Sequence, residues 1–168
     1  MRKKIIEGIK PFNEFFYRSC YYHQLLSGLS CFGIEKDNIL LNSFLLIKDN
    51  FKTETKILFS EKQLEKAMGY KATRCNITQK SLVKNINKNR PVIVGVDCYY
   101  LENRKDTFNI SHSSHYILVY GYDLDSKELY VVEHNYLNSY VCTEQIITID
   151  MLLHANKMFK LGEFKKKK

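Results

Sequence analysis

The sequence predicts a single α+β domain, with helices mainly in its first half and an antiparallel sheet in its second half. Apolar residues recur at helical spacing before Pro91, whereas short β-branched runs separated by turn residues follow it. No internal repeat and no linker rich in Pro, Gly or Ser divides the 168 residues. We therefore expect one domain over residues 1–168 that ends in a short basic tail at 165–168.

Four helices are expected in the first half. The first begins at Cys20, with Ser19 as its N-cap and Gly33 as its C-terminal glycine. Its expected apolar stripe contains Tyr22, Leu25, Leu26, Leu29 and Phe32. The other three cover 37–47, 60–69 behind a capping box at Ser60, and 78–86 behind Thr78.

Three strands are expected in the second half. They cover Val92–Asp97, His115–Tyr122 and Glu128–Glu133. The last two are separated by the turn-like residues 123–127, which predicts a hairpin. A last helix is expected from an N-cap at Asp150 to Met158.

The five cysteines have neither the spacing of a zinc site nor that of a disulfide framework. An odd number of isolated cysteines is typical of free thiols in a reducing compartment. No apolar stretch is long enough to cross a membrane, and no complete signal peptide is recognisable. We therefore expect a soluble cytoplasmic protein without a membrane partner, a bound metal or a cofactor of its own.

The formal net charge of +8 leaves two interpretations open. The lysines are mostly scattered, as on an ordinary solvated surface, but the excess also suits an acidic macromolecular partner. No nucleic-acid-binding module is recognisable, so nucleic acid is an improbable partner.

Cys20 is the candidate nucleophile. A cysteine in the first turn of a helix lies near the positive end of the helix dipole, which favours the reactive thiolate. The backbone N–H groups there can also stabilise a developing oxyanion. The alternative is that Cys20 packs as a small apolar residue.

His115 is the candidate base, because it begins a strand from which its ring can face a helix N-terminus. Glu133 and Asn135 share one face of the next strand, and either can accept a hydrogen bond from the imidazole Nδ1–H. His112 lies three residues before His115 in a serine-rich loop, where it can line the cleft.

Residues 96–133 contain the strings VDCYYL, ISHSSHYILVYGYD and LYVVE. Together with the early cysteine, they resemble the N-terminal domain family of the butirosin biosynthesis protein H, which has a papain-like fold. The positions that match are Cys20, Asp97, His112, His115, Gly121, Tyr122, Asp123 and Glu133. The third catalytic residue is usually an aspartate in that family, whereas this chain has Glu133, followed by His134 and Asn135. The register of the strand favours Glu133 over Asn135.

The resemblance implies a cytoplasmic cysteine acyltransferase of natural-product biosynthesis, similar to the amide synthases of closthioamide type. The acyl group would come from an acyl or peptidyl carrier protein, which brings its own phosphopantetheine, and would pass through a Cys20 thioester to a small amine. The oxyanion would be held by the Cys20 backbone N–H, with Asn13 as the nearest side-chain amide. His112 and Asp97 would contact the substrate.

Two other functions remain open. A cysteine peptidase of the leader-peptide type would use the same catalytic residues with a peptide donor and water. A non-catalytic module that binds an acidic partner would account for the charge but would need no alignment of Cys20 with His115.

Overall fold

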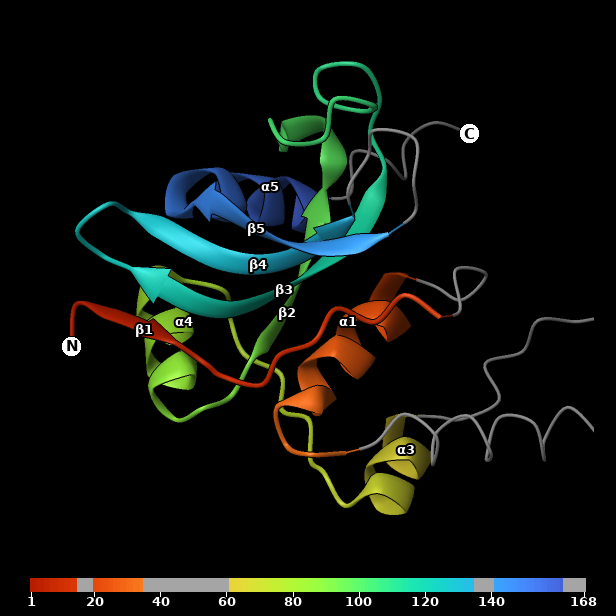
Figure 1. Ribbon diagram of the computed structural model, residues 1–168. Coiled ribbons are helices and arrows are strands. Elements are labelled where there is room, and N and C mark those ends of the chain that lie inside the picture. The colour runs from red at the N-terminus through yellow and green to blue at the C-terminus, as the bar shows by residue number, and fades with distance from the viewer. Residues whose placement is uncertain (15–19, 35–60, 135–140, 162–168) are drawn as a thin grey trace, which may run out of the picture.

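The computed structural model describes residues 1–14, 20–34, 61–134 and 141–161 (Figure 1). The predicted helix at 37–47, the N-caps at Ser19 and Ser60, Asn135 and the basic tail lie outside these residues. Helices and one antiparallel sheet make up the described part, which confirms the mixed α and β class.

The sheet is built around β3 (Ser114–Asp123). On one side of β3 lies β4 (Glu128–His134), which in turn pairs with β5 (Cys142–Thr148). On its other side, β2 (Val92–Asp97) pairs with residues 114–119 and β1 (Lys3–Ile5) with residues 121–123. The three predicted strands and their hairpin are confirmed, whereas β1 and β5 were not predicted.

The helices are α1 (Cys20–Ser30), α3 (Glu61–Met68), α4 (Gln79–Asn87) and α5 (Ile149–Leu161), with a 3₁₀ turn η1 (Cys98–Tyr100). Thr78 caps α4 in a capping box with Ser81, and Gly33 follows α1 with a φ of 68°. The expected apolar stripe of α1 is wrong at Phe32, which lies beyond the helix end and is 53% exposed.

Close packing places the start of α1 against the start of β3. A Cβ atom added to Gly28 would lie 3.2 Å from Leu118 Cδ1, so the helix approaches the strand closely at this point. Nearer its N-terminus, the ring of Tyr21 meets that of Tyr116 edge-on at 5.4 Å between centroids. The first turn of α1 is therefore held beside residues 115 and 116 of β3.

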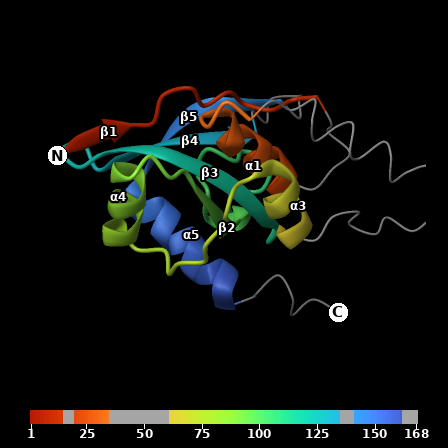
Figure 2. The same ribbon diagram turned by 90° about the horizontal axis from the view of Figure 1, so that it is seen from below.

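Helices α4 and α5 complete the core around the strands. Helix α4 contributes Leu82 and Ile86, and α5 contributes Leu152 and Ala155. In Figure 1, α1 and α4 are drawn below the strands and α5 above them, and the view from below in Figure 2 shows α4 and α5 on the side of β3 away from β5. None of the helices in the described residues is both long and apolar enough to cross a membrane.

Candidate active site

Cys20 and His115 come together across the contact between α1 and β3. Cys20 is the first residue of α1 and is half-buried, whereas His115 is the second residue of β3 and is only 5% exposed. The Cys20 sulfur is hydrogen-bonded to the His115 side chain, and the backbone N–H groups of Tyr116 and Tyr21 donate to it. The structure thus brings together two residues that are 95 positions apart in the sequence.

Glu133 lies on the other side of the imidazole. Its Oε1 is 2.7 Å from His115 Nε2 and accepts the backbone N–H of His134 at 2.7 Å. Glu133 is 1% exposed, and its Oε2 has no hydrogen-bond partner in the part of the chain that the structure describes. The predicted contact through Nδ1 is wrong, because Nε2 faces the carboxylate and leaves Nδ1 as the ring nitrogen for the thiol.

The strand register explains how Glu133 reaches His115. Leu118 pairs with Val132, so Glu133 stands opposite residue 117 and is a diagonal neighbour of His115 on the same face. Diagonal neighbours are roughly 7–8 Å apart at their backbones, a distance that long side chains can bridge. The extra methylene of glutamate, compared with aspartate, adds about 1.5 Å to that reach.

The charges of this chain favour a thiolate and an imidazolium. Burial disfavours the imidazolium, but the Glu133 carboxylate and the Cys20 sulfur outweigh it and raise the pKa of His115 from 6.5 to about 9. Burial likewise raises the pKa of Cys20, but the hydrogen bond and charge of His115 and the two backbone N–H groups lower it below 9.0 overall. The sulfur is therefore a stronger nucleophile near neutral pH than an ordinary thiol.

Arg104 and Asp106 extend the charged chain beyond Glu133, and sequence reasoning missed both. The Arg104 guanidinium donates from Nε and Nη2 to the two carboxylate oxygens of Asp106, each at 3.0 Å. Its Nη1 lies 3.7 Å from Glu133 Oε1. Arg104 is 5% exposed, so this guanidinium balances the buried carboxylate behind the imidazole.

His112 and Asp97 form a second pair nearby in the sequence. Asp97 is fully buried: its Oδ1 accepts the N–H of Tyr99 at 3.1 Å and of Ser113 at 3.3 Å, and its Oδ2 lies 2.8 Å from His112 Nδ1. The ring of His112 stacks on that of Tyr99 at 4.3 Å between centroids. Both oxygens of Asp97 are engaged in this way and hold His112 in place, and the substrate contact expected from the sequence stays a prediction.

Asn13 is occupied elsewhere. Its Oδ1 accepts the backbone N–H of Cys142 at 2.6 Å, and its Nδ2 donates to the Cys142 carbonyl oxygen at 3.1 Å. Both polar atoms of the amide therefore tie the N-terminal segment to β5. The Asn13 amide therefore binds the Cys142 backbone and does not serve as an oxyanion donor, and the backbone N–H of Cys20 remains the candidate.

His134 and His23 lie beside the site although their sequence pattern gave no reason to group them. The ring centroid of His134 is 5.0 Å from that of His115 and 5.8 Å from that of His23. Burial lowers the pKa of His134 to about 3, with smaller electrostatic contributions from His115, His23 and Arg104, so its ring is neutral. His154 is exposed and contacts Tyr100.

The sequence of this chain matches the model of one known protein family. The family model described as "Butirosin biosynthesis protein H, N-terminal" matches residues 41–134, more than half of the chain. The chain belongs to this family. The match contains Asp97, His112, His115 and Glu133, whereas Cys20 precedes it.

Membership of the butirosin biosynthesis protein H N-terminal family indicates a papain-like enzyme of acyltransferase or peptidase type. The mixed α and β architecture and the contact between a helix-start cysteine and a strand histidine agree with that class. A search of the curated proteins found no match, and a search of the solved structures also found none.

Proposed function

We propose that this protein is a cysteine acyltransferase that forms an amide in natural-product biosynthesis. The acyl group comes from the thioester of an acyl or peptidyl carrier protein and passes through Cys20 to an amine. The observation that supports this most strongly is the continuous chain of contacts from the Cys20 sulfur through the His115 ring to the buried Glu133 carboxylate. A thiolate held against an imidazolium is suited to attack a thioester.

In the first half of the reaction, the Cys20 thiolate attacks the thioester carbonyl carbon. The oxyanion that forms is held by the backbone N–H of Cys20 at the start of α1. When the carbon–sulfur bond to the donor breaks, the His115 imidazolium gives its proton to the departing phosphopantetheine thiolate. The products are an acyl–Cys20 thioester and a free carrier thiol.

In the second half, the amine attacks the acyl–Cys20 carbonyl. The now neutral His115 takes a proton from the amine nitrogen, and the imidazolium is stabilised by Glu133 at 2.7 Å. Collapse of the second tetrahedral intermediate breaks the bond to sulfur, so the amide leaves and the thiolate–imidazolium pair is restored.

The geometry favours Glu133 as the third catalytic residue. Its carboxylate is buried, aligned with His115 Nε2 and backed by Arg104. A carboxylate stabilises the imidazolium of both half-reactions more strongly than the neutral amide of the alternative, Asn135, would.

The excess of basic residues supports a carrier protein as the donor. With 26 Lys and Arg against 18 Asp and Glu, the chain attracts acidic surfaces. If docking depends on this charge, acylation by a carrier-bound thioester slows as salt is added, whereas acylation by a small uncharged thioester does not.

Intact-protein mass spectrometry with an acylated carrier protein tests the proposal. We expect one acyl adduct on the wild type and on Cys31→Ala, a matched control that removes a thiol from the residue just after α1. We expect no adduct on Cys20→Ala, and addition of an amine should convert the adduct into amide faster than water hydrolyses it.

An adduct that persists in Cys20→Ala, or an absence of adduct on the wild type with every carrier-bound thioester tried, refutes the proposal. Cleavage of peptides without any carrier protein would instead assign the same residues to a cysteine peptidase.

A further inference from the structure

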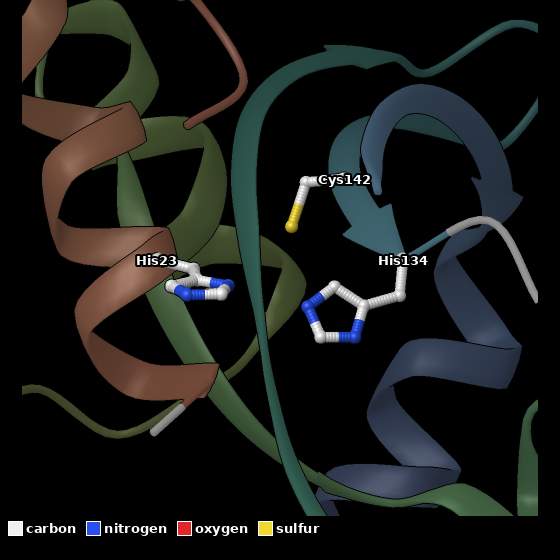
Figure 3. A group of neighbouring side chains, drawn as sticks. All are labelled: His23, His134 and Cys142. Atoms are coloured by element: carbon white, nitrogen blue, oxygen red, sulfur yellow. The ribbon is translucent and has the colours of Figure 1, made fainter. Parts of the chain in front are cut away.

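Three side chains that the proposed reaction does not use converge beside it: His23, His134 and Cys142. They come from α1, the end of β4 and the start of β5. One ligand atom from each, a ring nitrogen or the sulfur, lies within 4.8 Å of the other two. Figure 3 shows the sulfur and the two imidazole rings directed toward a shared space between the helix and the strands.

Two imidazoles and a thiol are the donors that Zn²⁺ prefers. Bond lengths of about 2.0–2.1 Å to nitrogen and about 2.3 Å to sulfur place the ligand atoms of a tetrahedral site roughly 3.3–3.6 Å apart. Closing from at most 4.8 Å to that spacing takes no more than about 1.5 Å, which side-chain rotations can supply.

We propose that His23, His134 and Cys142 form a binding site for Zn²⁺, in which a water or another small ligand takes the fourth position. Binding replaces the thiol proton of Cys142 by the metal and releases that proton to solvent. A site with three protein ligands and one open position is the arrangement that zinc adopts where it exchanges ligands.

The backbone around these residues is held in place. Cys142 is anchored on both its N–H and its carbonyl by Asn13, and it pairs with His134 across the β4–β5 ladder. His23 is in the first turn of α1 and only 2% exposed, and the ring of Phe12 packs edge-on against it at 6.0 Å. Ligands carried by a helix and two paired strands satisfy the demand for a pre-organised metal site.

The charges near the site are mixed. The positive groups of Arg104 and His115 and the Asp106 carboxylate act on His134, whereas the Glu133 carboxylate and the Cys20 sulfur act on Cys142. The Cys142 thiolate formed on binding cancels one of the two charges of the ion, and the nearby carboxylate offsets part of the other.

A second group, His115 with Glu133 and His134, shares one ligand with the proposed site. There, the 2.7 Å hydrogen bond between His115 Nε2 and Glu133 Oε1 already joins two of the three ligand atoms. A metal at that position would have to break this bond, whereas a metal held by His23, His134 and Cys142 leaves it intact. The geometry therefore favours the site that contains Cys142.

Titration of the chelator-treated full-length protein with Co²⁺ tests the proposal, since Co²⁺ replaces Zn²⁺ and reports thiolate ligation through a charge-transfer absorption band. We expect a band that saturates at one equivalent and disappears when Zn²⁺ is added. Cys142→Ser should abolish it, and His23→Gln should weaken binding about tenfold or more. Cys31→Ser and His154→Gln are the matched controls and should leave the titration unchanged.

Cys20→Ala separates this site from metal capture by the catalytic thiol. A band that is lost in Cys20→Ala and kept in Cys142→Ser overturns the proposal, and so does the lack of any thiolate band in the wild type. Circular dichroism of each variant shows that it is folded, and His23→Gln provides an independent test if Cys142→Ser is not.

Discussion

Replacing Glu133 by glutamine removes the charge behind the imidazole and keeps nearly the same side-chain shape. In the wild type, the pKa of His115 is about 9 instead of 6.5, which corresponds to roughly 3 kcal/mol in favour of the imidazolium. Without the carboxylate, burial still disfavours the imidazolium, and the Cys20 sulfur is the remaining group that favours it. We therefore expect the pKa of His115 to fall from about 9 toward 6.5 in Glu133→Gln.

The consequence for the thiol follows from the same values. At about pH 8, roughly nine tenths of His115 is protonated with a pKa of about 9, against about 3% with a pKa of 6.5. The imidazolium available to hold the Cys20 thiolate therefore drops by up to roughly 30-fold, the full factor applying if the pKa returns to 6.5. Acylation of Cys20 at that pH should slow by an order of magnitude or more.

The stability of the fold should also depend on the protonation of His115. Because the folded pKa of His115 is raised, its contribution to the free energy of unfolding is fully present below about pH 6.5 and is lost as the pH rises through about 9. The difference in unfolding free energy between the wild type and Glu133→Gln should shrink over the same interval.

A histidine side-chain NMR titration measures the pKa directly, with the His115 signals assigned by their loss in His115→Asn. Glu144→Gln is the matched control, since this carboxylate on β5 accepts a hydrogen bond from the Tyr120 hydroxyl instead of from the site. A pKa of His115 that stays near 9 in Glu133→Gln would refute the assignment of Glu133 as its charge partner.

Three further predictions concern the thiols, the buried charges and the packing of α1. Cys20 should react with iodoacetamide below pH 9 while Cys98 stays unmodified, because burial raises the pKa of Cys98 to about 11. Peptide mapping of the labelled protein checks this, and equal labelling of the two cysteines would contradict it. Arg104→Met leaves the carboxylates of Asp106 and Glu133 without their buried cation. The free energy of unfolding, measured in urea, should fall by roughly 3–5 kcal/mol. A loss below about 1 kcal/mol would argue against this role of Arg104. Gly28→Val should cost about 1–3 kcal/mol and slow Cys20 labelling by pushing α1 off β3, and unchanged labelling would show that this contact does not position the thiol.

The sequence predicted the parts of the fold whose residue pattern is set by burial. Val92–Asp97 and the hairpin strands are largely buried and stand out as apolar, β-branched runs. Strand β1 has only three residues, two of them lysines, and β5 mixes exposed polar residues with apolar ones. Their place in the sheet depends on pairing with β3 and β4, which no local pattern records.

The candidate site was predictable only in its outline. The helix-start position of Cys20 and the motif around His115 indicated that they meet, and the strand register favoured Glu133. Which imidazole nitrogen faces the carboxylate depends on the diagonal placement of the two strand residues, which the sequence does not specify. Arg104 was missed because it reaches Glu133 from a loop 29 positions away in the sequence.

The proposed zinc ligands are a second group of residues whose contact the sequence pattern does not predict. Sequence reasoning recognises zinc sites by closely spaced cysteines and histidines, whereas His23, His134 and Cys142 meet only because α1 packs beside the ends of β4 and β5. The expectation of no metal therefore rested on spacing alone.

The most direct test of the central claim is a pH titration of the Cys20 thiolate by ultraviolet absorption, taken as the difference between the wild type and Cys20→Ala. If His115 ionises the sulfur, the thiolate forms below the pH of 9.0 at which an ordinary cysteine titrates, and His115→Asn moves its formation to higher pH. A thiolate that forms at or above pH 9.0 in the wild type, or at the same pH with and without His115, would contradict the account.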